Sequence, residues 1–282
     1  MSKLEKKIVS AYLEACLTEI EALKPGNVHV FADGHGMVVQ DFIKSAEVSS
    51  QLIAKSPLSL GERIYLSVEA TWQAVQCNTN LGIVLLCAPI IQAVYLQQQK
   101  EIKDSLVDVL NQTTQRDAQW VFDAIKLANP AGLGQSDQHD VHQSAEGTLL
   151  EAMQAASAID TIALQYSNDY HQICNEGLPY YQKALERWQK PAWAATALYL
   201  YWLANYPDSH ISRKYNNDLA IQVSALAQVH EAALIKLDNP KLYFKKLFEF
   251  DTELKKQGIN PGTSADLTVA TLFLNILQHS AN

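Results

Sequence analysis

Residues 260–274 read NPGTSADLTVATLFL, a Pro-Gly break followed by two hydroxyl residues, one acid and an almost wholly apolar run. The apolar residues recur at helical spacing, and Thr263 or Ser264 is a natural N-cap for the predicted helix. Asp266 falls in the first predicted turn, where the helix dipole favours an acid by about 0.3–1 kcal/mol. Because this helix is apolar on nearly every side, we expect neighbouring helices to cover its start. A covered carboxylate usually pairs with a cation or a metal.

The same helical periodicity runs through most of the chain. No segment of comparable length alternates as a strand does, so the sequence predicts an all-α fold. No low-complexity linker, fixed repeat or sharp change in composition divides the chain. We therefore predict one domain over residues 1–282, a single bundle of about ten helices. The segments with this periodicity are 3–22, 41–54, 60–77, 81–99, 115–128, 145–175, 179–204, 216–237, 240–257 and 264–279.

Composition and charge limit the class of protein. With 282 residues, of which 48% are hydrophobic, the chain can bury a sizeable core. The 22 basic residues are diluted among 30 acidic ones, which argues against a surface that binds nucleic acid. The four cysteines lie far apart without a CxxC pair, and we interpret them as thiols in a reducing compartment. The charged start MSKLEKKIVS lacks the apolar segment of a secretion signal, so we expect a cytoplasmic protein.

The most apolar stretch is LGIVLLCAPIIQAVYL, residues 81–96. It is shorter than the roughly 20 residues that span a bilayer, and it contains Pro89. We interpret it as a core helix kinked near Pro89, not as a membrane segment. The sequence leaves the oligomeric state open, and a homodimer is one of the states that we consider.

Polar or glycine-containing breaks interrupt the predicted helices at several further places. In ALKPGNVHVFADGHG, Lys24 precedes a Pro-Gly turn whose Gly26 allows close backbone approach, and Asn27 and His29 add polar groups. One interpretation is a phosphate cradle. The other is an ordinary interhelical turn in which the charge of Lys24 caps the preceding helix.

The second break is the turn Asn78-Thr79-Asn80 between two apolar helices. Buried polar groups need hydrogen-bond partners. Either Thr79 or Asn80 is the N-cap of helix 81–99, or the three side chains face a ligand. Glu69 lies two to three turns upstream, near enough to point toward the same place. An acid on a largely apolar helix is a candidate metal ligand or catalytic group, although an exposed Glu is the commoner case.

The least helical window is NPAGLGQSDQHDVHQ, residues 129–143, which we interpret as a loop over the site or beside it. Its polar side chains superficially suit a divalent metal, but such short spacing also fits a solvated loop. These side chains are Asp137, His139, Asp140 and His142. In the helical segment that follows, Glu151 sits among apolar residues and is a further candidate.

The stretch YPDSHISRKYN places Asp208 and Ser209 before Arg213 and Lys214. An adjacent Arg and Lys next to a helix break can clamp a polyphosphate, Arg through its planar fork and Lys as a point charge. The alternative is a solvated charge pair.

Taken in order, these stretches resemble a known family. KPGNVH, CNTNLGIVLL, HDV with LLEAM after it, DSHISRK and NPGTSADLTVATLF look like the motifs of the triphosphoribosyl-dephospho-CoA synthase family, over about residues 10–277. Members of this family are all-α and supply the prosthetic-group precursor of citrate lyase and malonate decarboxylase. The resemblance implies a transferase that uses ATP as triphosphoribosyl donor to 3′-dephospho-CoA, or to a related cofactor precursor, and releases adenine.

One motif departs from the family pattern. Citrate-lyase-type members usually read Asn-Thr-His-Lys-Gly where this chain reads Asn-Thr-Asn-Leu-Gly at residues 78–82, so an imidazole and an ammonium are lost. The NTNLG form is similar to a branch associated with methanopterin-type one-carbon cofactor synthesis. A pterin or furan cofactor precursor is therefore a second candidate acceptor.

The chemistry of such a transfer suggests roles for the candidate residues. Displacing adenine from the ribose creates oxocarbenium character that a carboxylate stabilises, a base accepts the acceptor's proton, and Mg²⁺ with basic groups holds the triphosphate. We predict Glu69 and Asp266 for metal binding or oxocarbenium stabilisation, and Glu151 or Asp140 for acid-base work. The predicted phosphate- and nucleotide-binding residues are Lys24, Gly26, Asn27, His29, Asn78, Thr79, Asn80, Arg213, Lys214 and Ser264.

Two other classes of function stay open at this point. A metal-dependent hydrolase of nucleotides or ADP-ribose-like substrates would use the same acids with water as the acceptor. A non-catalytic helical module would keep a nucleotide-binding site and act through a partner. Adenine release without an organic acceptor would indicate the hydrolase, and ATP binding without adenine release would indicate the module.

Overall fold

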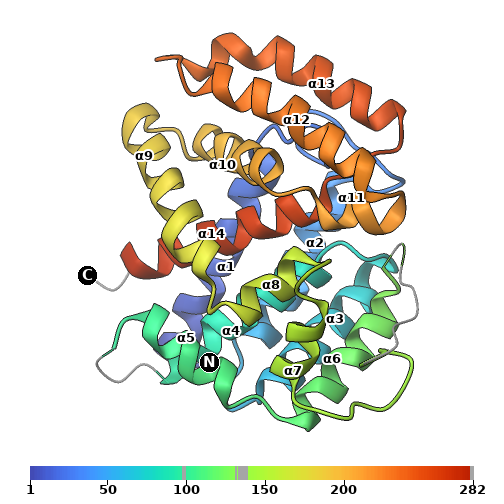
Figure 1. Cartoon of the computed structure of the whole chain (residues 1–282). Helices are drawn as coiled ribbons and strands as arrows, with labels where there is room; N and C mark the ends of the chain where they lie inside the picture. The colour runs from blue at the N-terminus through green and yellow to red at the C-terminus, as the bar shows by residue number, and fades with distance from the viewer. Residues whose placement is uncertain (97–99, 131, 133–138, 280–282) are drawn as a thin grey trace. The chain divides into compact units, whose positions relative to one another are not determined.

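A computed structural model of the chain describes residues 1–96, 100–130, 132 and 139–279. Within this part of the chain the elements are α-helices, one π-helix and one 3₁₀-helix, with no strand, so the all-α prediction is confirmed (Figure 1). Two isolated bridges, His29–Ala32 and Gly34–Met37, are the β-type pairings of this part. No helix described here combines the length and the apolar content needed to cross a membrane. The four cysteines remain thiols, as predicted.

Backbone contacts group the chain into two compact units. Unit 1 comprises Met1–Leu13 and Ile43–Gln172, and unit 2 comprises Glu14–Phe42 and Ile173–Asn282. Helices α1 (Lys3–Glu21) and α2 (Val39–Ile53) each contribute residues to both units. Each unit is therefore discontinuous in sequence. The prediction of a single domain is compatible with two such units and stays a prediction.

Unit 1 contains six further helices along the chain. They are α3 (Leu60–Val75), α4 (Leu81–Leu96), α5 (Ile102–Asn111), α6 (Gln115–Ala128), α7 (Leu149–Ala156) and α8 (Thr161–Ser167). Helix α4 is buried over most of its length, which confirms the predicted core helix, and it runs without interruption through Pro89. Residues 97–99, at the predicted end of this helix, lie outside the described residues.

Side chains of unit 1 compensate for the proline inside α4. Pro89 has no N–H, so the carbonyl of Leu85, one turn earlier, lacks its usual helical donor. The hydroxyl of Tyr166 donates to this carbonyl at 2.6 Å. The hydroxyl of Tyr170 donates to the neighbouring Leu86 carbonyl at 3.1 Å. A tyrosine hydroxyl thus replaces the hydrogen bond that the proline removes.

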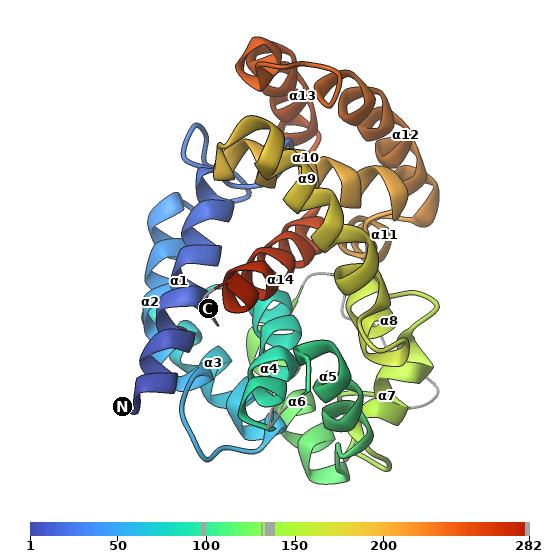
Figure 2. The same cartoon turned by 90° about the vertical axis from the view of Figure 1, so that its left-hand side faces the viewer.

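Unit 2 contains the remaining elements, from residue 173 onward. They are the π-helix η1 (Ile173–Gly177), α9 (Leu178–Trp188), α10 (Pro191–Asn205), α11 (Ser209–Lys214), α12 (Asn217–Leu234), the 3₁₀-helix η2 (Pro240–Tyr243), α13 (Phe244–Lys256) and α14 (Gly262–His279). Figures 1 and 2 both show α12 and α13 side by side as a helical hairpin.

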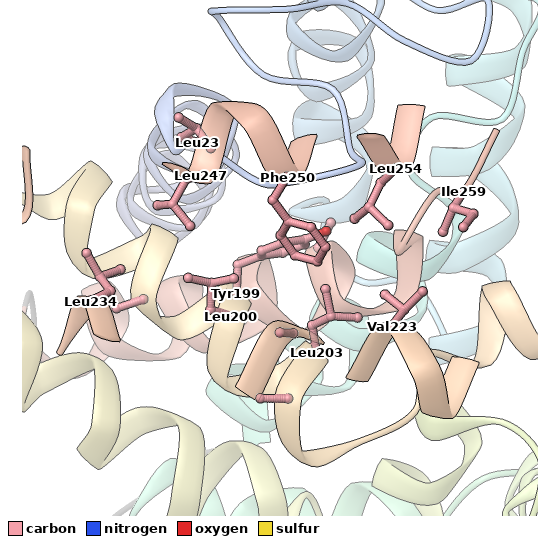
Figure 3. Packing of buried hydrophobic residues seen from close by; sticks show 14 of the residues in the cluster. Leu23, Tyr199, Leu200, Leu203, Val223, Leu234, Leu247, Phe250, Leu254 and Ile259 are labelled. Atoms are coloured by element: carbon pink, nitrogen blue, oxygen red, sulfur yellow. The ribbon is translucent and has the colours of Figure 1, made fainter. Parts of the chain in front are cut away.

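A hydrophobic cluster of unit 2 holds α10, α12 and α13 together (Figure 3). Its members include Tyr199 of α10, Val223 of α12 and Phe250 of α13. Leu23 and Ile259 belong to the same cluster. These two residues directly precede the Lys24 and Asn260 turns, so the core anchors both turns.

The described residues form fourteen α-helices where about ten were predicted, because caps divide long segments and two helices lie outside all predicted segments. In the predicted segment 145–175, Thr148 and Glu151 form a capping box that begins α7. Asp160 then accepts hydrogen bonds from two backbone N–H groups and begins α8. Helices α5 and α11 lie outside every predicted segment. Long periodic segments were therefore recognised as helical, but their divisions were missed.

Candidate functional site

Asp208 is buried in unit 2 and caps two helices at once. Its Oδ1 accepts hydrogen bonds from the backbone N–H groups of His210 (3.0 Å) and Ile211 (3.2 Å) at the start of α11. Its Oδ2 accepts hydrogen bonds from the N–H and the hydroxyl of Ser264, both at 2.8 Å, in the first turn of α14. Asp208 therefore joins the DSHISRK segment to the NPGTSAD segment.

The N-cap predicted at Thr263 or Ser264 is wrong. Helix α14 already begins at Gly262, so both hydroxyl residues lie inside its first turn. The acceptor comes instead from Asp208, which lies 56 positions earlier in the chain. Burial raises the pKa of the Asp208 carboxyl, while the hydrogen bonds from Ser264 and from the start of α11 act in the opposite direction.

The Lys24 turn lies directly against the Asn260 turn. Gly26 has a φ of +84°, and a Cβ at this position would lie 2.8 Å from Cδ of Pro261. Gly26 therefore lets the two turns approach closely, and its contact with phosphate stays a prediction. Asn27 Nδ2 donates a hydrogen bond to Asn260 Oδ1 at 2.8 Å. The KPGNVH and NPGTSAD motifs thus meet through their turns.

Lys24 is fully buried and has internal partners. Its Nζ forms an ion pair with the carboxylate of Glu19 and donates to Asn27 Oδ1 at 2.8 Å. Burial lowers the pKa of Lys24, whereas the negative charges of Glu19 and Asp266 raise it. Half-buried Asp266 is therefore electrostatically coupled to Lys24. A contact between Lys24 and phosphate stays a prediction.

Three polar groups surround one oxygen of Asp251. Its Oδ1 accepts from the backbone N–H of Gly26 at 2.9 Å and lies 3.0 Å from Lys255 Nζ and 3.3 Å from His29 Nε2. Because the N–H of Phe31 donates to His29 Nδ1, the proton of neutral His29 is on Nε2, toward Asp251. Burial lowers the pKa of His29, which favours this neutral form. His29 therefore faces a carboxylate of α13.

Cationic and imidazole groups gather around α11. Burial, followed by the positive charges of Arg213 and Lys214, lowers the pKa of His210 to about 4. His35 also acts on His210, and its Nε2 donates to the carbonyl of Gly26 at 2.7 Å. Arg213 and Lys214 themselves are exposed. Two exposed cations beside two neutral imidazoles can bind an anion, because an anion would also favour protonation of the imidazoles.

In unit 1 the NTN turn begins α4. Asn78 Oδ1 accepts from the N–H of Leu81 at 3.2 Å. The backbone carbonyl of Asn80 accepts from the N–H of Val84 at 2.9 Å. Asn80 therefore occupies the predicted cap position with its backbone, but Asn78 supplies the side-chain cap.

The side chains of Thr79 and Asn80 turn instead toward hydroxyl groups of unit 1. Thr79 Oγ1 lies 2.5 Å from Ser45 Oγ. Asn80 Nδ2 donates to Thr71 Oγ1 at 2.9 Å and to Ser49 Oγ at 3.2 Å. The NTN turn is thus held by neutral groups of α2 and α3.

Glu69 and Asp140 have neighbours close in sequence. Glu69 is half-buried on α3 and accepts a hydrogen bond from the hydroxyl of Tyr65 at 3.2 Å. Asp140 Oδ1 accepts from the N–H of His142 at 2.8 Å. Asp137, from the same predicted loop, lies outside the described residues.

Glu151 is exposed and completes the capping box of α7. Its Oε2 accepts from the backbone N–H of Thr148 at 2.7 Å. This hydrogen bond lowers the pKa of Glu151, and the nearby His139 acts in the same direction. Glu151 therefore has a structural role whether or not it takes part in catalysis.

The predicted site residues fall into both units. Glu69 and Glu151 belong to unit 1, whereas Arg213 and Asp266 belong to unit 2, so their convergence stays a prediction. Among the residues that the structure describes, no three His, Cys, Asp or Glu side chains are grouped to hold a metal ion. Mg²⁺ bound with a triphosphate needs only one or two protein carboxylates, and single acids such as Glu69 and Asp266 fit that requirement.

Several residues of these clusters are absent from the set predicted from sequence, among them His210, Asp251 and Thr71. His210 stands inside the DSHISRK motif itself, so a readable signal was available. Asp251 and Thr71 lie within ordinary helical segments, and their partners are more than eight positions away or belong to other elements. No local pattern could have indicated these two.

Comparison with protein families now places the chain. The profile of the CitG family, ATP:dephospho-CoA triphosphoribosyl transferase, matches residues 5–282. The chain belongs to this family. The resemblance read from the motifs is thereby confirmed, and this CitG-family protein is a triphosphoribosyl transferase.

A solved structure shares the fold of this CitG-family protein. It is a crystal structure from Archaeoglobus fulgidus that is provisionally called a triphosphoribosyl-dephospho-CoA synthase. The TM-score is 0.63 and the sequence identity 23%, over 82% of this chain and 96% of that one. Among curated proteins, none matches the chain.

Proposed function

We propose that this CitG-family transferase moves the triphosphoribosyl group of ATP to a hydroxyl of 3′-dephospho-CoA or a related cofactor precursor, with release of adenine. The observation that carries the proposal is the Asp208–Ser264 junction of unit 2. It joins the DSHISRK and NPGTSAD motifs beside the cations of α11. A family motif rich in cations is what a triphosphate donor requires.

The reaction exchanges one bond at the ribose anomeric carbon. The bond from C1′ to N9 of adenine breaks, and a bond from C1′ to the acceptor oxygen forms. The acceptor hydroxyl loses its proton, and adenine gains one. Positive charge develops on the ribose in between, and a carboxylate close to C1′ stabilises it. Asp266 and Glu69 are the acids we assign to this role, and Glu151 or Asp140 to the proton transfers.

The triphosphate would lie against α11. Arg213 offers a planar fork of donors and Lys214 a point charge. His210 and His35, neutral in the structure, would gain positive charge as the phosphates approach. Mg²⁺, held by the phosphates together with Asp266 or Glu69, would neutralise part of the phosphate charge.

The NTN turn indicates which acceptors the chain could use. Asn80 stands where citrate-lyase-type members have histidine, and an amide does not accept a proton near neutral pH. The acceptor in this chain is therefore one of two kinds. It is 3′-dephospho-CoA, with a residue other than Asn80 as the proton acceptor, or it is a precursor of the pterin or furan type. Both acceptors belong in the test.

The test is incubation with ATP, Mg²⁺ and a panel that contains dephospho-CoA and pterin and furan cofactor precursors. We expect free adenine by chromatography and, on one acceptor, the mass of an added triphosphoribosyl group. Adenine release without any acceptor would overturn the transferase in favour of a hydrolase. ATP binding in calorimetry without adenine release on any acceptor would favour a non-catalytic module.

A pair of variants tests the phosphate role of α11. Replacing Arg213 and Lys214 together by Ala should raise the KM for ATP about tenfold or more, because two charge-assisted contacts are lost. The matched control replaces Lys245 and Lys246 on α13, which are exposed lysines of the same unit. An equal effect of both pairs would mean that general charge, not a specific contact, sets the KM.

A further inference from the structure

The amide of Asn80 is held in one orientation inside unit 1. Asn80 is 5% exposed, and its Nδ2 lies within hydrogen-bond distance of two hydroxyl oxygens, Thr71 Oγ1 at 2.9 Å and Ser49 Oγ at 3.2 Å. Thr71 is on α3 and Ser49 is on α2. Two helices therefore fix the side chain of a motif residue from two directions.

The hydroxyl hydrogens show which end of the amide faces them. Ser49 Oγ donates its hydrogen to the carbonyl of Ser45 at 2.6 Å, and Thr71 Oγ1 donates to the carbonyl of Ser67 at 3.2 Å. Each hydroxyl has one hydrogen, so each can only accept from Asn80. The group of Asn80 that faces them must therefore be the NH₂, and both of its hydrogens are used.

The amide oxygen of Asn80 consequently points away from the hydroxyl pair. In the described part of the chain no hydrogen bond reaches this Oδ1, and it is not among the fully enclosed polar atoms that lack a partner. It is thus an unused acceptor on a fixed side chain that keeps 5% of its surface exposed. An acceptor that is already fixed costs a ligand little reorganisation.

We propose that Ser49 and Thr71 are positioning residues that hold Asn80 so that its Oδ1 accepts a hydrogen bond from the nucleotide substrate. The inference rests on the proposed use of ATP. The shared chemistry is an N–H or O–H donor, which ATP carries at the adenine amino group and at the ribose hydroxyls. A neutral histidine in this place has only one N–H and could not occupy both hydroxyl acceptors. The hydroxyl pair therefore matches an asparagine.

The positioning residues are tested by ATP binding in calorimetry. Thr71→Val and Ser49→Ala each remove one acceptor for the Asn80 amide, and each should weaken ATP binding about tenfold, as expected for one hydrogen bond. Thr71→Ser keeps the hydroxyl and should bind ATP as the wild type does. That rescue separates positioning from a general packing effect.

The matched control for Ser49→Ala is Ser50→Ala. Ser50 is equally buried on α2, but its hydroxyl donates to the carbonyl of Glu47 and does not contact Asn80. We expect unchanged ATP binding for Ser50→Ala. Weakening as large as that of Ser49→Ala would overturn the role of the hydroxyl pair.

Nucleotide analogues identify the donor on the ligand. Inosine triphosphate has a carbonyl in place of the adenine amino group, and 2′- and 3′-deoxy-ATP each lack one ribose hydroxyl. The wild type should bind one of these analogues more weakly than ATP. In Asn80→Leu, the ratio of the dissociation constants of that analogue and of ATP should be close to one. Unchanged ratios in Asn80→Leu would overturn the inference, as would a wild type that does not bind ATP. If ATP binds with the expected discrimination but no adenine is released, the proposed transfer fails and this inference stands.

Discussion

Unit 2 holds its family motifs with buried charges, whereas unit 1 holds the NTN turn with neutral groups. In unit 2, Lys24 pairs with Glu19, and Asp208 binds two helix starts. In unit 1, the amide of Asn80 donates hydrogen bonds to two hydroxyl oxygens. Both arrangements give hydrogen-bond or ion-pair partners to buried side chains of a motif. They differ in the free-energy cost of removing one partner.

This difference has an energetic consequence. A charge that leaves water needs a close partner, since its desolvation penalty is several kcal/mol, and removing the partner exposes that penalty. A neutral amide or hydroxyl that loses a partner costs only about 1–3 kcal/mol. The motif turns of unit 2 should therefore be sensitive to single substitutions and to pH, and the NTN turn of unit 1 should be much less so.

The largest expected effect is that of Lys24→Met. It leaves Glu19 buried without its cation, and removing one partner of a buried pair typically costs about 3–5 kcal/mol. The free energy of unfolding, measured with urea at pH 7, should fall by this amount. Replacing both Glu19 and Lys24 by Met should recover most of the loss.

An exposed ion pair is the control for this effect. Lys100 pairs with Asp108 on the surface, at a side-chain exposure of 59% for the lysine. Lys100→Met should leave the free energy of unfolding nearly unchanged, because water screens an exposed pair. If Lys24→Met cost no more than Lys100→Met, buried charge would not distinguish the two units.

Asp208→Ala should have the next largest effect. It removes the acceptor for α11 and for the first turn of α14 together, and each lost cap costs about 1 kcal/mol, with a further penalty for the hydroxyl of Ser264. We expect a loss of about 3 kcal/mol in urea unfolding. Asp160→Ala is the comparison, because Asp160 caps α8 and the loss of this cap should cost about 1 kcal/mol. Equal losses would show that the second cap of Asp208 contributes nothing.

Much of the fold was readable because helices are local. The periodic segment 115–128 coincides with α6 in both bounds, and segment 3–22 differs from α1 by one residue. The division of segment 145–175 was missed although its signals were present, a Thr-x-x-Glu box at Thr148 and a capping acid at Asp160. Periodicity alone does not mark these divisions, and α5 and α11 lie outside the periodic segments, so the predicted number of helices is too low.

The candidate site was less predictable because its contacts are distant in sequence. The motifs point to turns that meet in unit 2, but Asp208 reaches Ser264 across 56 positions, and Gly26 reaches Asp251 across 225. No local pattern records such pairs. The burial of Lys24 was likewise hidden, because a lysine beside a Pro-Gly turn reads as exposed until its partner, Glu19, is known.

The pH dependence of stability should also separate the units. The pKa of His210 is lowered to about 4 in the folded protein, mainly by burial, from an ordinary value of about 6.5. As the pH falls from 6.5 to 4, the unfolded chain binds a proton at this residue before the folded chain does, so the folded state loses stability. Since His210 is only partly buried, we expect this loss to be about 2 kcal/mol. The wild type and His210→Asn are compared by urea unfolding at pH 7 and at pH 4.5. The free energy of unfolding should fall more between these pH values in the wild type than in the variant. An equal fall in both proteins would contradict this prediction.

The smallest expected effect tests unit 1 at a neutral contact. Tyr166→Phe removes the donor to the Leu85 carbonyl, which Pro89 leaves without a helical N–H, and should cost about 1–2 kcal/mol. Tyr170→Phe is the matched control. It removes the hydroxyl that donates to the Leu86 carbonyl, but this carbonyl retains the N–H of Ile90, one turn later, as a helical donor. It should therefore cost less. Neither loss should change between pH 5 and pH 8, since no charged group takes part, and a clear pH dependence of either would contradict the contrast between the two units.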